Sequence, residues 1–301
     1  MADGLLTTVD ETVAEAVARS RHRLAEAGSP TARLDAEVLV AEVLGRDRSW
    51  LAAHPEAMLD ASTRARLEAW VSRRADGEPI AYLRGWKEWH GQRVRTDARA
   101  LIPRPETEML VDLAVADIVR RLGVGATPIV AWDVGTGSGA IAMVVALRFR
   151  EALMLGQVRL IASDTSSEAL ELASENLAAE GLGTLVTMVA ADLLDPVGRG
   201  LPRPDVIVAN LPYVPHDELR ATGSLRHEPL AALDGGPDGL DVIRRLLDEL
   251  PAAAAPGAVA FLEIGTGQAE AAATRATEHG MVSSGHRDLA GIERVVEIRL
   301  P

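Results

Sequence analysis

The stretch Asp133-Val134-Gly135-Thr136-Gly137-Ser138-Gly139 decides the fold that we expect for this chain. It follows an apolar run at residues 129–134 and precedes a helical pattern at 140–149. Glycines permit a tight turn and let a ligand come close to the backbone, and the free amides that open the helix would face that ligand. The stretch therefore predicts a cofactor site on a strand, a glycine loop and a helix. A purely structural glycine turn is the alternative.

Strand and helix patterns alternate on the carboxyl side of this loop. Strands are expected at 129–134, 158–163, 185–190, 206–209 and 258–264, and helices at 140–149, 167–180 and 240–250. This alternation is typical of an open parallel sheet with helices on both faces. The last two strand patterns, 281–284 and 294–299, have a turn-rich segment between them. We therefore predict an α/β, Rossmann-like, mostly parallel seven-stranded sheet that ends in an antiparallel hairpin.

Residues 1–78 predict a small helical domain. Apolar stripes with helical spacing mark its segments, and Thr8 and Glu11 have the spacing of a capping box before the first one. Ser29-Pro30 predicts the start of the second segment, and residues 67–71 belong to a third. The domain could serve substrate recognition or act only as a packing appendage.

Residues 79–104 connect this domain to the rest of the chain. Aromatic residues and glycines alternate here, which predicts a β-hairpin linker. The catalytic domain is then expected at 105–301. Its first helix opens at Glu106, where carboxylates suit the helix dipole. Arg104 and Glu106 could border the mouth of the active site and orient a substrate, or this stretch could simply start the helix.

Composition limits the classes of protein that fit. Hydrophobic residues make up 48% of the chain and charged residues 25%, as in globular proteins. The chain has no cysteine, its seven histidines have no ligand-pair spacing, and no run of about 18 apolar residues occurs. We therefore expect a cytoplasmic monomer without a metal site or membrane segment. The net charge of −13 opposes binding to nucleic acid.

Two acidic residues follow strands on the carboxyl side of the glycine loop. Asp164 ends the second strand, a position where a carboxylate can accept both ribose hydroxyls of a nucleotide. Asp192 could receive an adenine amine, with Leu193 packed on the ring, although a solvated turn carboxylate is equally common there. Asp164 alone fits NAD as well as S-adenosylmethionine. The terminal hairpin and the motif described next favour S-adenosylmethionine.

The tetrapeptide Asn210-Leu211-Pro212-Tyr213 follows the fourth strand, beside the glycine loop. Its side chains suit a planar NH2 group, whose lone pair is delocalised and must be held in place. The Asn210 side-chain oxygen and the Leu211 carbonyl could accept the two hydrogens. Pro212 would stiffen the loop while Tyr213 stacks on the flat face. An ordinary strand-ending turn is the alternative.

The chain resembles the HemK/PrmC family of release-factor glutamine methyltransferases over nearly its whole length. The matching residues are Leu101-Ile102-Pro103-Arg104-Pro105-Glu106-Thr107-Glu108, Asp133 to Gly139, Asp164, Asn210 to Tyr213, Glu228-Pro229, Leu233-Asp234-Gly235-Gly236-Pro237-Asp238-Gly239 and Asp288-Leu289-Ala290-Gly291. The resemblance implies a class I S-adenosylmethionine-dependent methyltransferase that modifies the glutamine of the Gly-Gly-Gln loop in class 1 peptide chain release factors. It also implies that the methyl donor contacts Gly135 to Gly139, Asp164, Leu193 and Asn210. Residues Asn210 to Tyr213 would contact the substrate glutamine.

One residue departs from the family pattern. The family usually has Asn-Pro-Pro-Tyr, whereas Leu211 stands at the second position and resembles the motif of ribosomal RNA adenine dimethyltransferases. This residue is expected to act through its carbonyl, so the reaction type is preserved. A methyltransferase for the exocyclic amine of adenine in RNA or DNA is the alternative function, and a non-catalytic cofactor-binding module is a third. No role follows from the sequence for Asp234 to Gly239.

Overall fold

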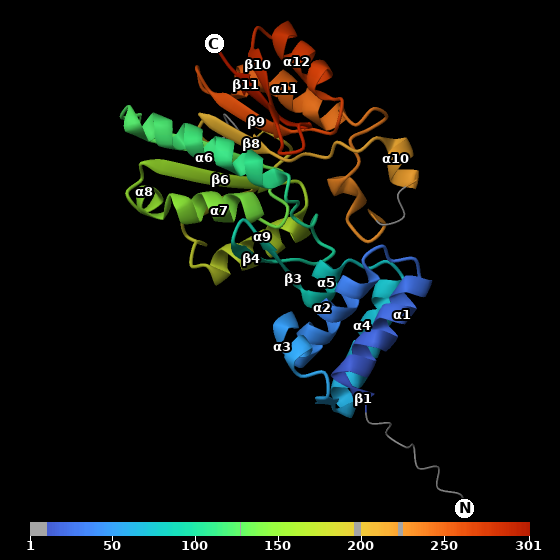
Figure 1. Cartoon of the computed structure of the whole chain (residues 1–301). Helices are drawn as coiled ribbons and strands as arrows, with labels where there is room; N and C mark the ends of the chain where they lie inside the picture. The colour runs from blue at the N-terminus through green and yellow to red at the C-terminus, as the bar shows by residue number, and fades with distance from the viewer. Residues whose placement is uncertain (1–10, 127, 196–199, 222–224) are drawn as a thin grey trace, which may run out of the picture. The chain divides into compact units, whose positions relative to one another are not determined.

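The computed structural model of the chain describes residues 11–126, 128–195, 200–221 and 225–301. The chain divides into two compact units, Met1–Gly85 and Trp86–Pro301, each described here by itself (Figure 1). The division falls within the segment 79–104. Residues Ile80–Arg84 of that segment form helix α5, and Trp86–Arg95 form the hairpin of β3 (Trp86–Trp89) and β4 (Gln92–Arg95). The functional division of the chain remains a prediction.

The first unit consists mainly of helices around one apolar core. They are α1 (Val13–Glu26), α2 (Ala32–Leu44), α3 (Arg48–Ala53), α4 (Ala61–Ala75) and α5, and β1 (Glu11–Thr12) pairs antiparallel with β2 (Met58–Leu59). The buried side chains of α1, α2 and α4 recur at helical spacing and fill this core. The unit therefore has a core of its own.

Two predicted helix starts in this unit are wrong. The capping box of α1 is formed by Thr12 and Glu15, while Glu11 lies in β1 and Thr8 lies outside the described residues. Helix α2 has Thr31 as its N-cap residue rather than starting at Ser29-Pro30. The Ser29 hydroxyl instead donates to the buried Asp35 carboxylate at 2.9 Å. Thr12 and Glu15 have the same spacing as Thr8 and Glu11, and pairing of β1 with β2 places Glu11 in a strand.

The second unit contains one seven-stranded sheet with the order β10-β11-β9-β8-β5-β6-β7. Strands β5 to β9 run parallel, β11 is antiparallel to β9, and β10 is antiparallel to β11. The strands are β5 (Ile129–Val134), β6 (Val158–Asp164), β7 (Val186–Ala190), β8 (Val206–Ala209), β9 (Val259–Glu263), β10 (Val282–Arg287) and β11 (Glu293–Arg299). The predicted fold class is therefore confirmed, including the reversed end of the sheet.

Helices cover both faces of this sheet (Figure 1). They are α6 (Thr107–Gly123), α7 (Ala140–Arg148), α8 (Arg150–Met154), α9 (Ser167–Ala179), α11 (Asp241–Ala253) and α12 (Ala269–Glu278). Helix α10 (His216–Ala221) and a short 3-10 helix at Leu230–Ala232 belong to the segment between β8 and α11. The sequence analysis did not predict α12. Its buried residues are Ala272 and Ala276, so it lacks the large apolar side chains that marked the predicted helices.

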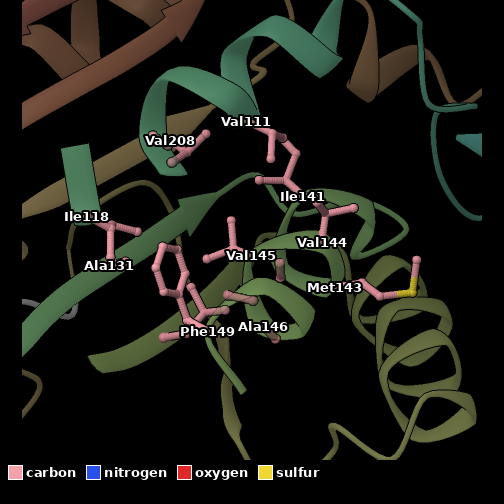
Figure 2. Packing of buried hydrophobic residues seen from close by; sticks show 14 of the residues in the cluster. Val111, Ile118, Ala131, Ile141, Met143, Val144, Val145, Ala146, Phe149 and Val208 are labelled. Atoms are coloured by element: carbon pink, nitrogen blue, oxygen red, sulfur yellow. The ribbon is translucent and has the colours of Figure 1, made fainter. Parts of the chain in front are cut away.

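The interior strand β5 contributes to the cores on both faces. Ile129 and Ala131 pack in one core, while Val130, Trp132 and Val134 pack in the other. Figure 2 shows the first core, where the apolar side chains of α7 gather beside α6 and Ala131. Since neighbouring side chains of a strand point to opposite faces, a strand covered on both sides is apolar throughout.

The register of the sheet brings four strand ends to one edge. Val134 of β5 pairs with Ser163 of β6 and with Ala209 of β8, and Ala209 pairs with Leu262 of β9. The residues that follow, the glycine loop, Asp164, Asn210 and Glu263, therefore lie at the carboxyl edge of the sheet. Within the described parts of the chain, no helix combines the length and apolar character needed to cross a membrane.

Candidate active site

The glycine loop turns from β5 into α7 at this edge. Gly135, Gly137 and Gly139 all have left-handed backbone angles, with φ of +71°, +56° and +77°. At Gly139, an added Cβ would lie 2.8 Å from the Cβ of Ala173 in α9, so only glycine fits between the two helices. The Thr136 amide donates to the Ser163 carbonyl at 2.8 Å. The loop therefore packs against α9 and is hydrogen-bonded to the end of β6.

Asp133 lies buried beneath the loop. Its Oδ2 accepts the Thr136 hydroxyl at 2.6 Å and the Ala142 amide at 3.0 Å. Burial raises the pKa of Asp133 to about 7, against the effect of these two donors, and the charge of Asp164 adds to the rise. The sequence analysis quoted Asp133 as part of the loop but gave it no separate role. It holds the loop to the start of α7.

Asp164 contacts the loop from the end of β6. Its Oδ2 accepts the Gly137 amide and its Oδ1 accepts the Ser166 amide, both at 2.9 Å. These contacts place a carboxylate next to the glycine turn, as the sequence analysis expected.

A cavity of about 400 Å³ opens above these residues. Ten of the predicted site residues line it: Gly135, Thr136, Gly137, Ser138, Asp164, Asp192, Leu193, Asn210, Leu211 and Pro212. Trp89, Thr107 and Arg245 also line the cavity and were not predicted. Four predicted residues, Gly139, Arg104, Glu106 and Tyr213, do not line it. Thr107 belongs to the stretch Leu101 to Glu108, which matched the family without a role for this residue, whereas Trp89 and Arg245 come from separate elements.

Leu193 and Asp192 form one wall of the cavity. Leu193 is buried and has a φ of +49°, a left-handed conformation that is unusual for a residue with a side chain. Such strain is kept where the surrounding structure demands it, often at binding sites. The Asp192 carboxylate accepts Arg245 Nη2 at 2.6 Å on the exposed rim. A ligand that used Asp192 would therefore share it with Arg245.

The Asn210 to Tyr213 motif is held by residues from other elements. Asn210 Nδ2 donates to the Thr107 hydroxyl at 3.0 Å, at the start of α6. Tyr213 Oη donates to Glu263 Oε1 at 3.0 Å, and Gln268 Nε2 donates to the Tyr213 carbonyl at 2.9 Å. Burial and the Glu263 carboxylate raise the pKa of Tyr213 above its usual range. Tyr213 is therefore kept neutral, and its ring is held at the hydroxyl end.

The segment from Leu233 to Gly239 supports this motif from a second side. Val214 exchanges backbone hydrogen bonds with Leu233 and Gly235, at 2.9 and 3.0 Å. A Cβ on Gly239 would lie 2.2 Å from the Tyr213 carbonyl oxygen. Gly239, which had no role in the sequence analysis, therefore lets this segment pack directly on the backbone of the motif.

Arg104 forms an ion pair with Glu228, whose side chain is buried. Glu228 Oε2 also accepts the Ile102 amide at 3.0 Å. From the hairpin, Trp89 Nε1 donates to the Arg104 carbonyl at 2.7 Å, and Lys87 Nζ to the Pro103 carbonyl at the same distance. The segment before α6 is thus clamped on two sides. Glu106 is the N-cap residue of α6 without a side-chain capping bond.

These features define a class of protein. A glycine loop, a carboxylate after the second strand of the cofactor half and an acceptor-rich motif after β8 surround one cavity. They lie at the carboxyl edge of a sheet whose last strand is reversed. This combination is that of a class I S-adenosylmethionine-dependent methyltransferase.

Comparisons with known proteins identify the family. Residues 15–85 match the model of the PrmC N-terminal domain, and residues 111–233 match the methyltransferase small domain. The release factor glutamine methyltransferase of Bordetella pertussis is 39% identical over 90% of this chain and 96% of its own length. That of Deinococcus radiodurans is 40% identical over 92% and 94%. The chain belongs to the release factor glutamine methyltransferase family.

A solved structure supports the fold. The hMettl16 catalytic domain, in complex with MAT2A 3'UTR hairpin 1, matches with a TM-score of 0.52 and 12% identity, over 82% of this chain and 86% of that chain. At this identity the likeness concerns the fold alone.

Proposed function

We propose that this protein transfers a methyl group from S-adenosylmethionine to the side-chain amide nitrogen of the glutamine in the Gly-Gly-Gln motif of class 1 peptide chain release factors. The observation that carries the proposal is the place of the Asn210 to Tyr213 motif. Asn210, Leu211 and Pro212 line the same cavity as the glycine loop and Asp164. A methyl donor in the cavity and an amide at the motif would therefore meet.

The cavity fits the methyl donor in size and chemistry. Its volume of about 400 Å³ lies within the range of small-molecule sites. Asp164 would hold the ribose hydroxyls, Asp192 and Leu193 the adenine, and Gly135 to Gly139 the amino-acid part of the donor. When bound, S-adenosylmethionine supplies an electrophilic methyl group on its sulfonium.

The motif would hold the amide by its hydrogens. Asn210 Nδ2 donates to the Thr107 hydroxyl. The Asn210 side-chain oxygen would therefore accept one hydrogen of the substrate NH2 group. The Leu211 carbonyl would accept the other, and Tyr213 would stack on the flat amide while Pro212 stiffens the turn. Positioning the nitrogen against the methyl group would supply most of the rate. The methylated nitrogen is strongly acidic and loses its proton to water or to a nearby acceptor.

Charges around the cavity favour a protein substrate over RNA or DNA. Among the described residues that line the cavity, the two arginines already have carboxylate partners. Arg99 pairs with Asp97 at 2.8 Å and Glu175 at 2.9 Å, and Arg245 pairs with Asp192 at 2.6 Å. Phosphate binding would require these cations to leave their partners. Methylation of adenine therefore remains only as an outcome of the test below.

The proposed partner sets the proposed location. Release factors act on ribosomes, so we place the reaction in the cytoplasm. The oligomeric state, expected to be a monomer, is a separate prediction.

The test is methyl transfer from labelled S-adenosylmethionine to a purified class 1 release factor. The Gly-Gly-Gln→Gly-Gly-Ala factor and total RNA serve as parallel substrates. Label on the intact factor alone would support the assignment. Label on RNA would support the adenine enzyme, and equal label on both factors would point to another protein site.

A further inference from the structure

Glu263 lies at the carboxyl edge of the sheet, where the parallel strands meet the antiparallel ones. It is the last residue of β9, between β8 on one side and β11 on the other, where it pairs with Val295. Only 1% of its surface is exposed. A carboxylate in such a place is costly unless its charge or its hydrogen bonds are used. The sequence analysis gave Glu263 no role.

Glu263 contacts the side chains that hold the motif, although it does not line the cavity itself. Its Oε1 accepts Tyr213 Oη at 3.0 Å. The Thr107 hydroxyl, which accepts Asn210 Nδ2 at 3.0 Å, is also close enough to Glu263 to lower the pKa of the carboxyl group. Thr107 and Glu263 thus each hold one side chain of the motif, Asn210 and Tyr213 respectively.

The other oxygen, Oε2, is buried and has no hydrogen-bond partner among the residues that the structure describes. Two more charged groups face the carboxylate: Glu106 at the start of α6 and Arg294 of β11, which pairs with Asp288 at 3.3 Å. Burial has the largest effect and raises the pKa of Glu263. The site therefore favours Glu263 as a hydrogen-bond acceptor more than as a fixed negative charge.

We propose that Glu263 is a positioning residue for methyl transfer, whose buried carboxylate fixes the Tyr213 ring. The inference rests on the proposed function. Tyr213 can guide a flat amide only if its ring keeps one orientation, and a small misplacement of a reacting group can cost about a hundredfold in rate. The bond at Oη fixes the far end of the ring, while the bonds of the Tyr213 backbone fix the near end.

A first experiment tests the hydrogen bond between Tyr213 and Glu263 and requires no methyl-transfer assay. The chain has two tyrosines, so Tyr82→Phe leaves Tyr213 as the only one. In this background, 3-fluorotyrosine labelling and fluorine NMR report the ionisation of the Tyr213 phenol. Glu263→Leu should lower the midpoint by about one pH unit or more, because a carboxylate acceptor favours the neutral phenol. An unchanged midpoint would overturn the proposal whatever the substrate is.

A second experiment separates positioning from folding. Glu263→Gln keeps an acceptor oxygen and should hold kcat within about threefold, while Glu263→Leu should lower kcat by at least about tenfold with donor affinity and KM within about twofold. Glu297→Leu is the matched control, because Glu297 is a buried glutamate of the adjacent strand β11 and should leave kcat unchanged.

Two kinetic outcomes would overturn the inference: a folded Glu263→Leu variant with normal kcat, or equal losses for the glutamine and leucine variants. If the wild-type protein methylates no release factor, this result contradicts the proposed function and not the inference about Glu263. The fluorine measurement still decides whether Glu263 holds Tyr213.

Discussion

The backbones of Gly239 and Tyr213 touch so closely that a Cβ on Gly239 would lie 2.2 Å from the Tyr213 carbonyl oxygen. The same carbonyl accepts Gln268 Nε2 at 2.9 Å. Two segments distant from the motif in sequence therefore meet at the residue that is proposed to stack on the substrate. A methyl group at Gly239 would have to move one of them.

Gly239→Ala should lower kcat by at least about tenfold, because Tyr213 would shift together with its backbone. Gly257→Ala is the matched control. Gly257 also has a positive φ, +69°, but an added Cβ would meet nothing within 4 Å. The control should lose only about 1 kcal/mol of stability and keep its kcat. Equal kinetic effects in the two variants would show that backbone strain, rather than the contact with Tyr213, is responsible.

Asn210→Ala should leave S-adenosylmethionine binding within a few-fold and reduce turnover by at least about a hundredfold. The variant removes the proposed acceptor for the substrate amide, a group that acts mainly in the transition state. Calorimetry with the donor and single-turnover transfer to a release factor would measure the two effects. Comparable losses in binding and turnover would mean that Asn210 serves mainly the cofactor.

Arg104→Met should destabilise the second unit by about 2 kcal/mol, since it leaves the buried Glu228 carboxylate without its ion-pair partner. Adding Glu228→Gln should restore at least half of this loss, because the buried charge is then removed as well. Urea unfolding of the single and double variants would test the pair. If Arg104 also orients the glutamine loop, KM for the release factor will stay raised in the double variant. A normal KM there would leave Arg104 with a structural role only.

Asp133→Asn should change how stability depends on pH. The pKa of Asp133 is raised to about 7 in the folded chain, whereas an unfolded aspartate has a pKa of about 3.9. Between these values the folded state holds a proton that the unfolded chain has lost, so the free energy of unfolding decreases as pH rises, by up to about 4 kcal/mol. Asparagine cannot titrate, so this contribution to the slope disappears.

Urea unfolding of both proteins at about pH 5 and about pH 8 would measure the difference. The stability of the variant relative to the unchanged chain should increase with pH. Parallel pH profiles for the two proteins would show that Asp133 is already ionised when it is buried.

Local sequence was enough to predict the strands of the seven-stranded sheet, the glycine loop and the reversed end of that sheet, but not the short strands β1 and β2. Burial on both faces makes β5 apolar at every position, and this pattern is visible without any knowledge of its neighbours. Helix boundaries were less certain, since Thr8 with Glu11 and Thr12 with Glu15 have the same capping spacing. Pairing of β1 with β2 placed Glu11 in a strand. Helix α12 was missed because its buried residues are alanines rather than large apolar side chains.

The sequence by itself therefore determined the fold class, the glycine loop and the Asn210 to Tyr213 motif to which we assign the chemistry, because neighbouring residues form each of them. Only the tertiary structure decided which distant residues support them. Thr107 meets Asn210 across 103 positions and Glu263 meets Tyr213 across 50. The order and register of β8 and β9 bring these residues to one edge, and helix α6 begins beside them. Contacts of this kind depend on how strands pair in space, which the periodicity of a single segment does not encode.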